Sequence, residues 1–256
     1  MYKGEALTDI DAIIPRIASS VTRYGSAIVR QFEMQGVYTT TSSIALVRSR
    51  DKLRSMQLFA RAGVGIPKTV FSRGMTTNID DLIDDLGGVP VIIKLARGTH
   101  GNGVVLAETK KAAKSVLQAF YVMDDEGTNI MLQEFIQESA GVDIRVVVVG
   151  GKVVASMKRQ SLDDDFRSNL HQGGEGSTIK LTDEERKVAQ KAAKAMGLPI
   201  CGVDMMRSER GPLVLEVNSS PGFGIEHVTG RNVAVKIIEH VEQNARGKRR
   251  RDRVGA

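Results

Sequence analysis

The residues best suited to chemistry lie between Asp204 and Gly222, in a stretch that alternates apolar segments with turns. Glu216 and Asn218 interrupt an apolar run there, and their spacing of two puts both side chains on one face of a strand. Asp204 follows the apolar residues 200–203, which we expect to form the preceding strand of a hairpin whose short polar turn runs from Arg207 to Pro212. The three side chains would then present oxygen ligands that suit Mg²⁺ beside phosphate oxygens. The alternative is that Glu216 and Asn218 face solvent on a half-buried strand.

A lysine and a glycine-rich loop form the second chemical feature. Lys94 lies in the apolar segment 89–96, where burying an ammonium costs free energy unless an anion accompanies it. The following loop contains Gly98, Thr99, Gly101, Asn102 and Gly103. Such glycines let backbone N–H groups approach an anion closely, although hairpin loops use glycine anyway. The loop leads into another apolar segment, so we predict a phosphate-binding hairpin flap rather than the strand–loop–helix of a Walker or Rossmann motif.

Further basic side chains stand on other segments: Lys52, Arg145, Arg159, Arg167 and Arg207. We expect them to add positive charge around bound phosphates. Arg145 shares a face with Asp143, so an ion pair within the sheet is the alternative there. Because phosphoryl transfer depends mainly on positioning and charge neutralisation, no nucleophilic triad or catalytic cysteine is required. At this stage the phosphoryl acceptor stays open between a hydroxyl, water and a carboxylate.

The composition is that of a soluble globular protein with one large domain or two small ones. The chain has 256 residues, of which 41% are hydrophobic and 26% charged. No apolar run approaches the roughly 20 residues of a membrane span, and the N-terminus does not read as a signal peptide. The single cysteine, Cys201, excludes an internal disulfide and fits a reducing cytoplasm, and its apolar surroundings indicate a core residue.

The net charge of +6 and the pI of about 9.5 favour an anionic partner such as a nucleotide or an acidic peptide. Much of the excess lies in the segment 246–253, which we interpret as a solvated tail. Contact of this tail with RNA or the ribosome is the alternative.

The hydrophobic patterns predict an alternating order of strands and helices. Residues 11–40 read as strand, helix and strand, as in a βαβ unit whose front is absent, which would leave a sheet edge open. A continuous helical segment follows from residue 43 to residue 62. Strands are expected at 68–72, 89–96, 130–136, 143–149, 152–157 and in the 204–222 hairpin, helices at 79–86, 110–120, 182–196 and 233–243, and a long polar loop at 157–174.

Taken together, these motifs resemble the RimK family of the ATP-grasp superfamily. The matching stretches are residues 50–57, Lys94 with 98–104, 133–136, 143–145, 165–171, 202–204 and 216–222. The resemblance implies an α+β and α/β architecture in which two α+β subdomains sandwich ATP. The expected divisions are a truncated α/β pre-ATP-grasp domain (1–43), two ATP-grasp subdomains (44–128 and 129–245) and the basic tail (246–256).

The resemblance also implies roles for individual residues. Lys52, Lys94 and the flap would hold the ATP phosphates, and Asp143 would lie near the ribose. Asp204, Glu216 and Asn218 would bind one or two Mg²⁺ or Mn²⁺ ions. The adenine pocket would be lined by Gln133, Glu134, Phe135 and Ile136, the nucleotide and acyl phosphate would be approached by Arg167, Ser168 and Asn169, and the catalytic residues would be Arg145, Arg159, Arg207 and Asn169.

RimK-like enzymes phosphorylate a carboxylate with ATP and let an amine attack the acyl phosphate. By this resemblance we expect addition of L-glutamate, singly or as poly-glutamate, to the C-terminal glutamate of the sixth protein of the small ribosomal subunit. The resemblance also implies a cytoplasmic homo-oligomer such as a tetramer, without a membrane partner. One alternative is the same chemistry on a small cofactor or carrier protein. Another is a non-catalytic, nucleotide-responsive module that binds the ribosome or RNA, which the high pI favours.

Overall fold

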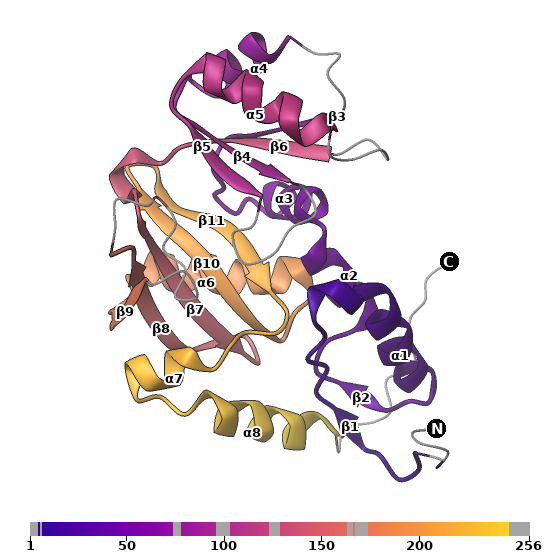
Figure 1. The fold of residues 1–256 in the computed structure, drawn as a ribbon. Helices are drawn as coiled ribbons and strands as arrows, with labels where there is room; N and C mark the ends of the chain where they lie inside the picture. Colours follow the sequence, from indigo (N-terminus) through magenta and orange to yellow (C-terminus); the bar gives the residue numbers. More distant parts are fainter. Residues whose placement is uncertain are drawn as a thin grey trace.

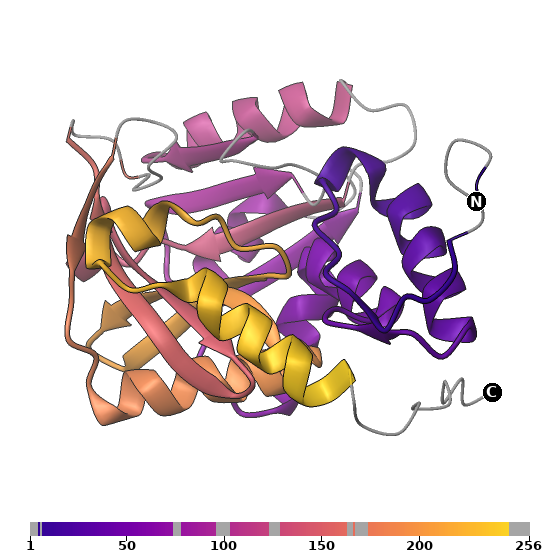
Figure 2. The ribbon, with the colours of Figure 1, turned by 90° about the horizontal axis from the view of Figure 1, so that it is seen from below.

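The computed structural model describes residues 5, 7–73, 78–95, 103–122, 129–162, 166 and 174–245. These residues form three units (Figure 1): an N-terminal β–α–β unit, an upper unit built on a four-stranded sheet, and a central unit built on a five-stranded sheet. Figure 2, seen from below, shows helix α8 running along the central sheet toward the N-terminal unit.

The N-terminal unit has the strand–helix–strand order that the sequence predicts. Strands β1 and β2 pair in parallel, with Ala12 opposite Tyr38, and α1 connects them after a short 3-10 turn. The Tyr38 hydroxyl and His240 Nε2 are 3.0 Å apart and share a hydrogen bond, which links this unit to the C-terminal helix. The elements are β1 (Ala12–Ile13), α1 (Thr22–Met34), β2 (Tyr38–Thr39) and α8 (Val233–Ala245).

The prediction of one continuous helical segment from 43 to 62 is wrong at Asp51. The chain forms α2 (Ser43–Arg50) and α3 (Lys52–Arg61), and Asp51 between them has extended backbone angles. The Asp51 carboxylate accepts a hydrogen bond of 2.9 Å from the N–H of Arg54. An aspartate that caps the following turn stabilises a new helix start, so the chain bends immediately before Lys52.

The upper unit confirms the predicted hairpin around Lys94. The sheet order is β3-β6-β4-β5, and β4 pairs antiparallel with β5. Helices α4 and α5 pack on it through a core that includes Ile83, Leu117 and Ile93. The flap residues 96–102, with Gly98, Thr99, Gly101 and Asn102, lie outside the described residues. The elements are β3 (Thr69–Arg73), α4 (Ile79–Asp85), β4 (Val91–Leu95), β5 (Val104–Ala107), α5 (Lys110–Val122) and β6 (Asn129–Glu134).

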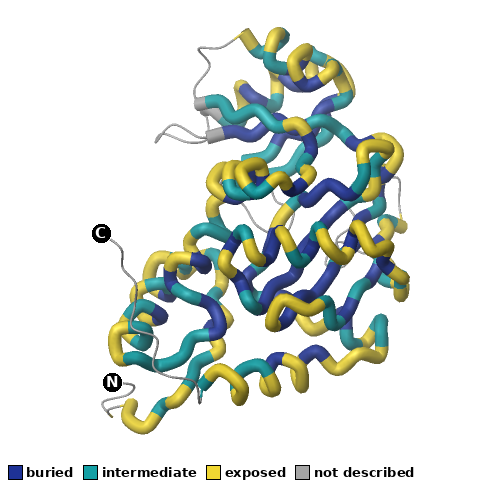
Figure 3. Tube along the Cα trace, turned by 180° about the vertical axis from the view of Figure 1, so that it is seen from behind, coloured by how far each residue is buried: buried dark blue, intermediate teal, exposed yellow. Residues whose placement is uncertain are grey.

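The central unit is an antiparallel sheet with helices on both faces. Its strand order is β11-β10-β7-β8-β9, and most of its core strands are buried (Figure 3). On the α6 face, Val146 and Val203 pack with α6 and α3, whereas on the α8 face, Val147 and Ile200 pack with α7 and α8. The elements are β7 (Val142–Val149), β8 (Lys152–Gln160), β9 (Glu175–Thr178), α6 (Asp183–Met196), β10 (Ile200–Ser208), β11 (Gly211–Asn218) and α7 (Gly224–Thr229), with a 3-10 turn at Gln137–Ser139.

The predicted long polar loop from 157 to 174 is shorter in the structure. Strand β8 continues to Gln160, and the unpredicted strand β9 pairs with its end, with Gln160 opposite Glu175. The last residues of β8, Lys158, Arg159 and Gln160, are all polar and therefore resemble a loop in the sequence, although Arg159 belongs to the buried ion-pair network of the sheet. Residues 163–165 and 167–173 lie outside the described residues, and so do Arg167, Ser168, Asn169 and the tail 246–256.

Candidate active site

Neighbouring strands of the central sheet gather charged side chains at one end of the α8 face. Asp204 on β10 stands between Arg145 on β7 and Glu216 on β11, each of which is its direct cross-strand partner. Asp143 and Arg159 form the next cross-strand pair, between β7 and β8. Because side chains alternate along a strand, all five share a face. The expected hairpin that brings Asp204, Glu216 and Asn218 to one face is confirmed, since Asn218 lies opposite Gly202.

The arginines and aspartates of this cluster form a buried ion-pair network. Arg145 binds Asp204 with both ends of its guanidinium fork, at 2.8 Å to Oδ1 and 2.6 Å to Oδ2. Arg159 binds both oxygens of Asp143, with Nε 2.6 Å from Oδ1. Its second nitrogen also lies 3.0 Å from Asp204 Oδ2. Arg159, Asp143 and Asp204 are all at most 5% exposed, so this network is held far from water.

The environment shifts the pKa values of these groups in opposite directions. Burial raises the pKa of Asp143, and Arg159 beside it offsets only part of that effect. Burial also acts on Asp204, but Arg145 and Arg159 together outweigh it and hold the pKa of Asp204 well below its ordinary value. The Asp204 carboxylate is therefore ionised at neutral pH, and its charge-assisted contacts hold both guanidiniums in place. Because both Asp143 oxygens are bound by Arg159, its expected contact with a ribose stays a prediction.

Glu216 and Asn218 form the open side of the cluster. The Asn218 amide donates a hydrogen bond of 2.9 Å to Glu216 Oε1, and the Glu216 side chain is exposed. Among the described residues, no three His, Cys, Asp or Glu side chains come together as a metal-binding group. An oxygen set of Asp204, Glu216 and the Asn218 amide nevertheless fits the hard-donor preference of Mg²⁺, which keeps several water or phosphate ligands of its own.

Two lysines face this cluster, Lys94 from the upper unit and Lys52 from the start of α3. Lys94 on β4 donates a hydrogen bond of 2.7 Å to Gln133 Oε1, and Lys52 on α3 donates one of 3.0 Å to the carbonyl of Leu95. Glu216 attracts both ammonium groups electrostatically. Burial is the larger influence and lowers the pKa of Lys94 to about 8. The structure thus brings Lys52 on a helix and Lys94 and Glu216 on two different sheets together, as the sequence predicts for a phosphate site.

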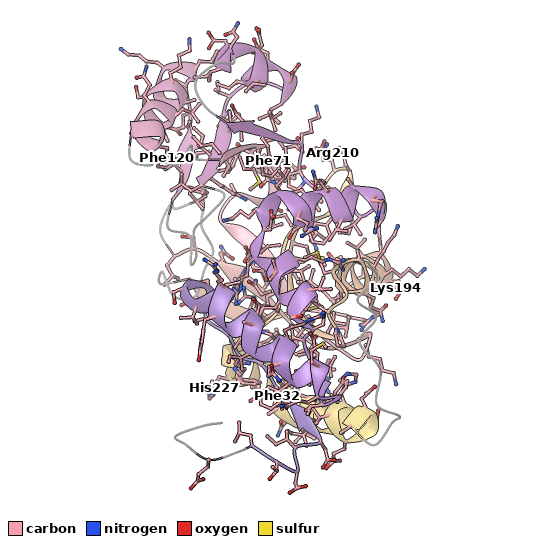
Figure 4. All side chains as sticks on the ribbon, turned by 90° about the vertical axis from the view of Figure 1, so that its right-hand side faces the viewer. Phe32, Phe71, Phe120, Lys194, Arg210 and His227 are labelled. Atoms are coloured by element: carbon pink, nitrogen blue, oxygen red, sulfur yellow. The ribbon has the colours of Figure 1, made fainter. Side chains whose placement is uncertain are left out.

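The predicted adenine-pocket segment forms the connection between the two sheets. The Gln133 amide donates a hydrogen bond of 2.9 Å to Thr69 Oγ1, and Ile136 is buried. Glu134 accepts a hydrogen bond of 2.5 Å from the N–H of Lys68 and forms an ion pair with Arg210 from the β10–β11 turn, which Figure 4 labels. These contacts engage the Glu134 side chain within the protein. Base recognition by residues 133–136, including Phe135, stays a prediction.

Arg207 is not brought to the cluster, contrary to the expectation for a catalytic arginine. Strand β10 continues to Ser208, and Arg207 points to the α6 face, three residues beyond Asp204. Its Nε lies 2.6 Å from Oε1 of Glu185, which belongs to the capping box that starts α6. The sequence interpretation placed Arg207 on a turn, where a side chain can point anywhere, whereas the strand fixes it on the opposite face from Asp204.

Arg50 also faces this site, although it has no role among the sequence predictions beyond its place in the stretch 50–57. It lies at the end of α2, immediately before Asp51 and Lys52, and donates a hydrogen bond of 2.7 Å to the carbonyl of Ile17. Burial lowers its pKa, and Glu216 is the charged group that counteracts this effect. Within the described part of the chain, its Nε has no hydrogen-bond partner. Its only sequence signal is its place beside Lys52.

Comparison with known protein families decides the relationship. The RimK-like ATP-grasp domain matches residues 49–241, and the RimK PreATP-grasp domain matches residues 1–46. The chain belongs to the RimK-like ATP-grasp family. It is accordingly an ATP-grasp ligase, and ATP and metal binding are typical of this family.

Similar sequences and structures agree with this membership. A probable alpha-L-glutamate ligase of Aliivibrio fischeri is 58% identical over 253 residues, which cover 98% of this chain and 83% of the relative. One from Maridesulfovibrio salexigens is 56% identical, covering 96% and 80%. A RimK domain ATP-grasp protein of Sphaerobacter thermophilus has the same fold with a TM-score of 0.70, at 19% identity, over 91% of this chain and 81% of that one.

The D-alanine–D-alanine ligase of Bacillus anthracis also shares the fold, with a TM-score of 0.71 at 20% identity, over 93% of this RimK-like chain and 82% of that chain. The expected ATP-grasp architecture of two α+β subdomains behind a pre-ATP-grasp unit is thereby confirmed. Within the ranges that the structure describes, the RimK-like chain has no helix long and apolar enough to cross a membrane.

Proposed function

We propose that this RimK-like ligase joins L-glutamate to the C-terminal glutamate of a small-subunit ribosomal protein, using ATP and an acyl-phosphate intermediate. The observation that carries the proposal is the meeting of Lys52 and Lys94 with the Asp204–Glu216–Asn218 cluster between two sheets. Relatives that share more than half of its residues are named as probable alpha-L-glutamate ligases, which supports glutamate as the amine.

The chemistry follows from the charges around the proposed phosphate position. Lys52 and Lys94 would bind the phosphates of ATP, and Mg²⁺ held by Asp204, Glu216 and Asn218 would neutralise charge on the transferred group. The acceptor carboxylate attacks the γ-phosphorus, and ADP leaves. The resulting acyl phosphate is a better electrophile than the carboxylate, because phosphate is a better leaving group than oxide.

The amine of L-glutamate then attacks the acyl carbon, and phosphate leaves as the amide forms. Arg145 and Arg159 are suited to stabilise the negative charge of that step, because Asp204 and Asp143 hold their guanidiniums in fixed positions. Both arginines keep their charge throughout, since neighbouring carboxylates raise the pKa of each. Asn169 would share in stabilising this negative charge.

The decisive experiment measures ADP release with ATP, Mg²⁺ and L-glutamate, with and without a peptide that ends in two glutamates. Mass spectrometry of the peptide follows. Peptide-dependent ADP release with mass increments of one glutamate residue is the expected result. ADP release without peptide growth would contradict the protein acceptor and indicate a small molecule in its place. Folded protein that binds ATP and releases no ADP under either condition would contradict ligase activity altogether.

A further inference from the structure

Two basic residues flank Asp51, and they extend toward different parts of the molecule. Arg50 ends α2 and Lys52 begins α3, at the junction that Figure 1 shows between the N-terminal and upper units. Lys52 donates its hydrogen bond to the carbonyl of Leu95, at the end of β4 in the upper unit. Arg50 instead donates one of 2.7 Å to the carbonyl of Ile17 in the N-terminal unit. Lys52 thus lies on the flap side of the junction and Arg50 on the N-terminal side.

Arg50 lies close to the proposed metal ligands. Helix α2 packs against β11, the strand that carries Glu216 and Asn218, and Glu216 attracts the Arg50 guanidinium electrostatically. Among the described residues, no carboxylate forms an ion pair with Arg50, and the Glu216 side chain instead accepts the hydrogen bond of the Asn218 amide. The guanidinium therefore adds a positive charge to the site without being neutralised by a direct partner.

The contacts of Arg50 leave one end of its guanidinium for a ligand. Nε is buried and unpartnered, so it cannot reach a ligand. One terminal nitrogen binds Ile17, whereas the other forms no hydrogen bond within the described ranges and is not among their buried unpartnered atoms. Each terminal nitrogen carries two N–H donors, so an anion can bind end-on to both. Burial lowers the pKa of Arg50, and such an anion would offset the cost of burying its charge.

The side on which Arg50 lies indicates which anion this is. In the proposed reaction, Lys52 and Lys94 bind the phosphates of ATP from the flap side. Phosphoryl transfer places the attacking and leaving oxygens roughly in line on opposite sides of the phosphorus. With ADP leaving on the flap side, the attacking carboxylate has to approach from the N-terminal side, where Arg50 lies. The planar guanidinium fork matches the two oxygens of a carboxylate.

We propose that Arg50 binds the acceptor carboxylate that receives the γ-phosphoryl group of ATP and holds it for in-line attack. This inference rests on the proposed function and assigns a binding residue to its acceptor. The guanidinium can stay on the same group as the acyl phosphate forms, because phosphoryl oxygens accept its hydrogen bonds as carboxylate oxygens do. ATP and L-glutamate also carry anionic groups, and the test separates them from the acceptor.

Two substitutions of Arg50 separate its charge from its structural contact. Arg50→Gln and Arg50→Lys both keep an N–H donor for the carbonyl of Ile17. Gln removes the positive charge, whereas Lys keeps it without the planar fork. Arg48→Gln is the matched control, because Arg48 lies in the same last turn of α2 and two residues along a helix place it on the opposite side. Melting temperatures verify that each variant is folded.

Binding is measured first, without turnover. Calorimetry with Mg²⁺ and a non-hydrolysable ATP analogue gives Kd for a peptide that ends in two glutamates and for the same peptide with its terminal α-carboxylate amidated. We expect wild-type protein to prefer the free carboxylate, and Arg50→Gln to reduce this preference at least about tenfold. Arg50→Lys should reduce it less, and Arg48→Gln should retain it. Kd for the ATP analogue should stay unchanged in all three variants.

Steady-state kinetics then identify the substrate that Arg50 serves. In Arg50→Gln, KM for the acceptor peptide should rise at least about tenfold, with KM for ATP and L-glutamate unchanged. A rise confined to ATP would assign Arg50 to the phosphates, and a rise confined to L-glutamate would assign it to the amine donor. Either result would overturn the inference.

An unchanged preference for the free carboxylate in folded Arg50→Gln would also overturn the inference, because it would reduce Arg50 to a structural link with Ile17. Growth of the peptide by the wild-type enzyme would still support the proposed function in that case. Wild-type protein that binds neither peptide would contradict the proposed acceptor itself, and the inference would fail with it.

Discussion

The two faces of the central sheet each carry arginine–carboxylate pairs, and the pairs differ in what surrounds them. On the α8 face, the Arg159 and Asp143 side chains are 3% and 7% exposed, and both belong to a network that includes Asp204 and Arg145. On the α6 face, Arg207 is 53% exposed and pairs with Glu185, a capping residue of α6. On the α8 face these residue types form a buried charged platform, which consists of Asp143, Arg145, Arg159 and Asp204. On the α6 face they stabilise the start of a helix.

The difference is set by what the sheet packs against. Helices α7 and α8 cover the apolar part of the α8 face, and the charged part faces Lys52 and Lys94 across the junction of the two sheets. The described α6 face is apolar along most of its length. Arg207 lies near the end of β10, beyond the apolar residues of that face. Burying these charges costs free energy, which is expected where charge has to be positioned for chemistry.

The most severe test of this comparison is Glu216→Gln. The substitution keeps the shape of an exposed side chain, so the melting temperature should stay within about 2 °C of wild type. It removes the negative charge that faces both lysines and the proposed metal position. We expect ADP formation to fall by roughly 10²–10³-fold. Glu239→Gln, which alters an exposed carboxylate on α8, is the control and should keep full activity. Near-normal turnover of Glu216→Gln would remove Glu216 from the site.

Asp204→Asn tests whether the buried platform contributes more to stability than an ion pair near the surface of the sheet. The substitution leaves Arg145 and Arg159 with one carboxylate between them, and breaking a buried ion pair typically costs about 3–5 kcal/mol. We expect the free energy of unfolding to fall by that order in urea titrations at neutral pH. The pKa of Asp204 is held below its ordinary value, so its stabilising contribution exists above that value and is lost as pH falls toward the lower folded-state pKa. An equal loss from Glu185→Gln would contradict the distinction between the faces.

Lys94 extends the comparison to pH. Its pKa of about 8 lies below the roughly 10.4 of an unfolded lysine, so between these values the unfolded chain binds more protons. The free energy of unfolding should therefore rise with pH across this window, by about 2–3 kcal/mol. Lys94→Met should abolish that part of the rise when unfolding is compared at intermediate and high pH. A wild-type profile with the same slope as the variant would contradict the burial of this ammonium.

Part of this arrangement could be predicted from local spacing. The two-residue interval between Glu216 and Asn218, and the short turn before them, were enough to place Asp204 on the same face. The pairing of Arg145 with Asp204 could not be predicted in this way, because it requires β7 to lie beside β10, and strand order is a long-range property. The hydrophobic pattern also failed to predict the end of β8, because Lys158, Arg159 and Gln160 are all polar and resemble a loop.

Arg207 shows a different limit. The alternation of side chains along β10 places it on the face opposite to Asp204, but the sequence prediction ended this strand before Arg207. The smallest effect that we predict is that of Arg207→Gln. Because the Arg207 side chain is 53% exposed and buried Glu185 keeps its hydrogen bond from the N–H of Thr182, the loss of unfolding free energy should stay below about 1 kcal/mol. ADP formation should be unchanged, since the side chain lies across the sheet from Asp204. Parallel urea titrations and ADP assays of Arg207→Gln and Arg145→Gln would measure this contrast. If Arg207→Gln lowered turnover as strongly as Arg145→Gln does, the α6 face would have to contribute to the reaction, and the division of the sheet into a charged platform and a helix-fastening face would be wrong.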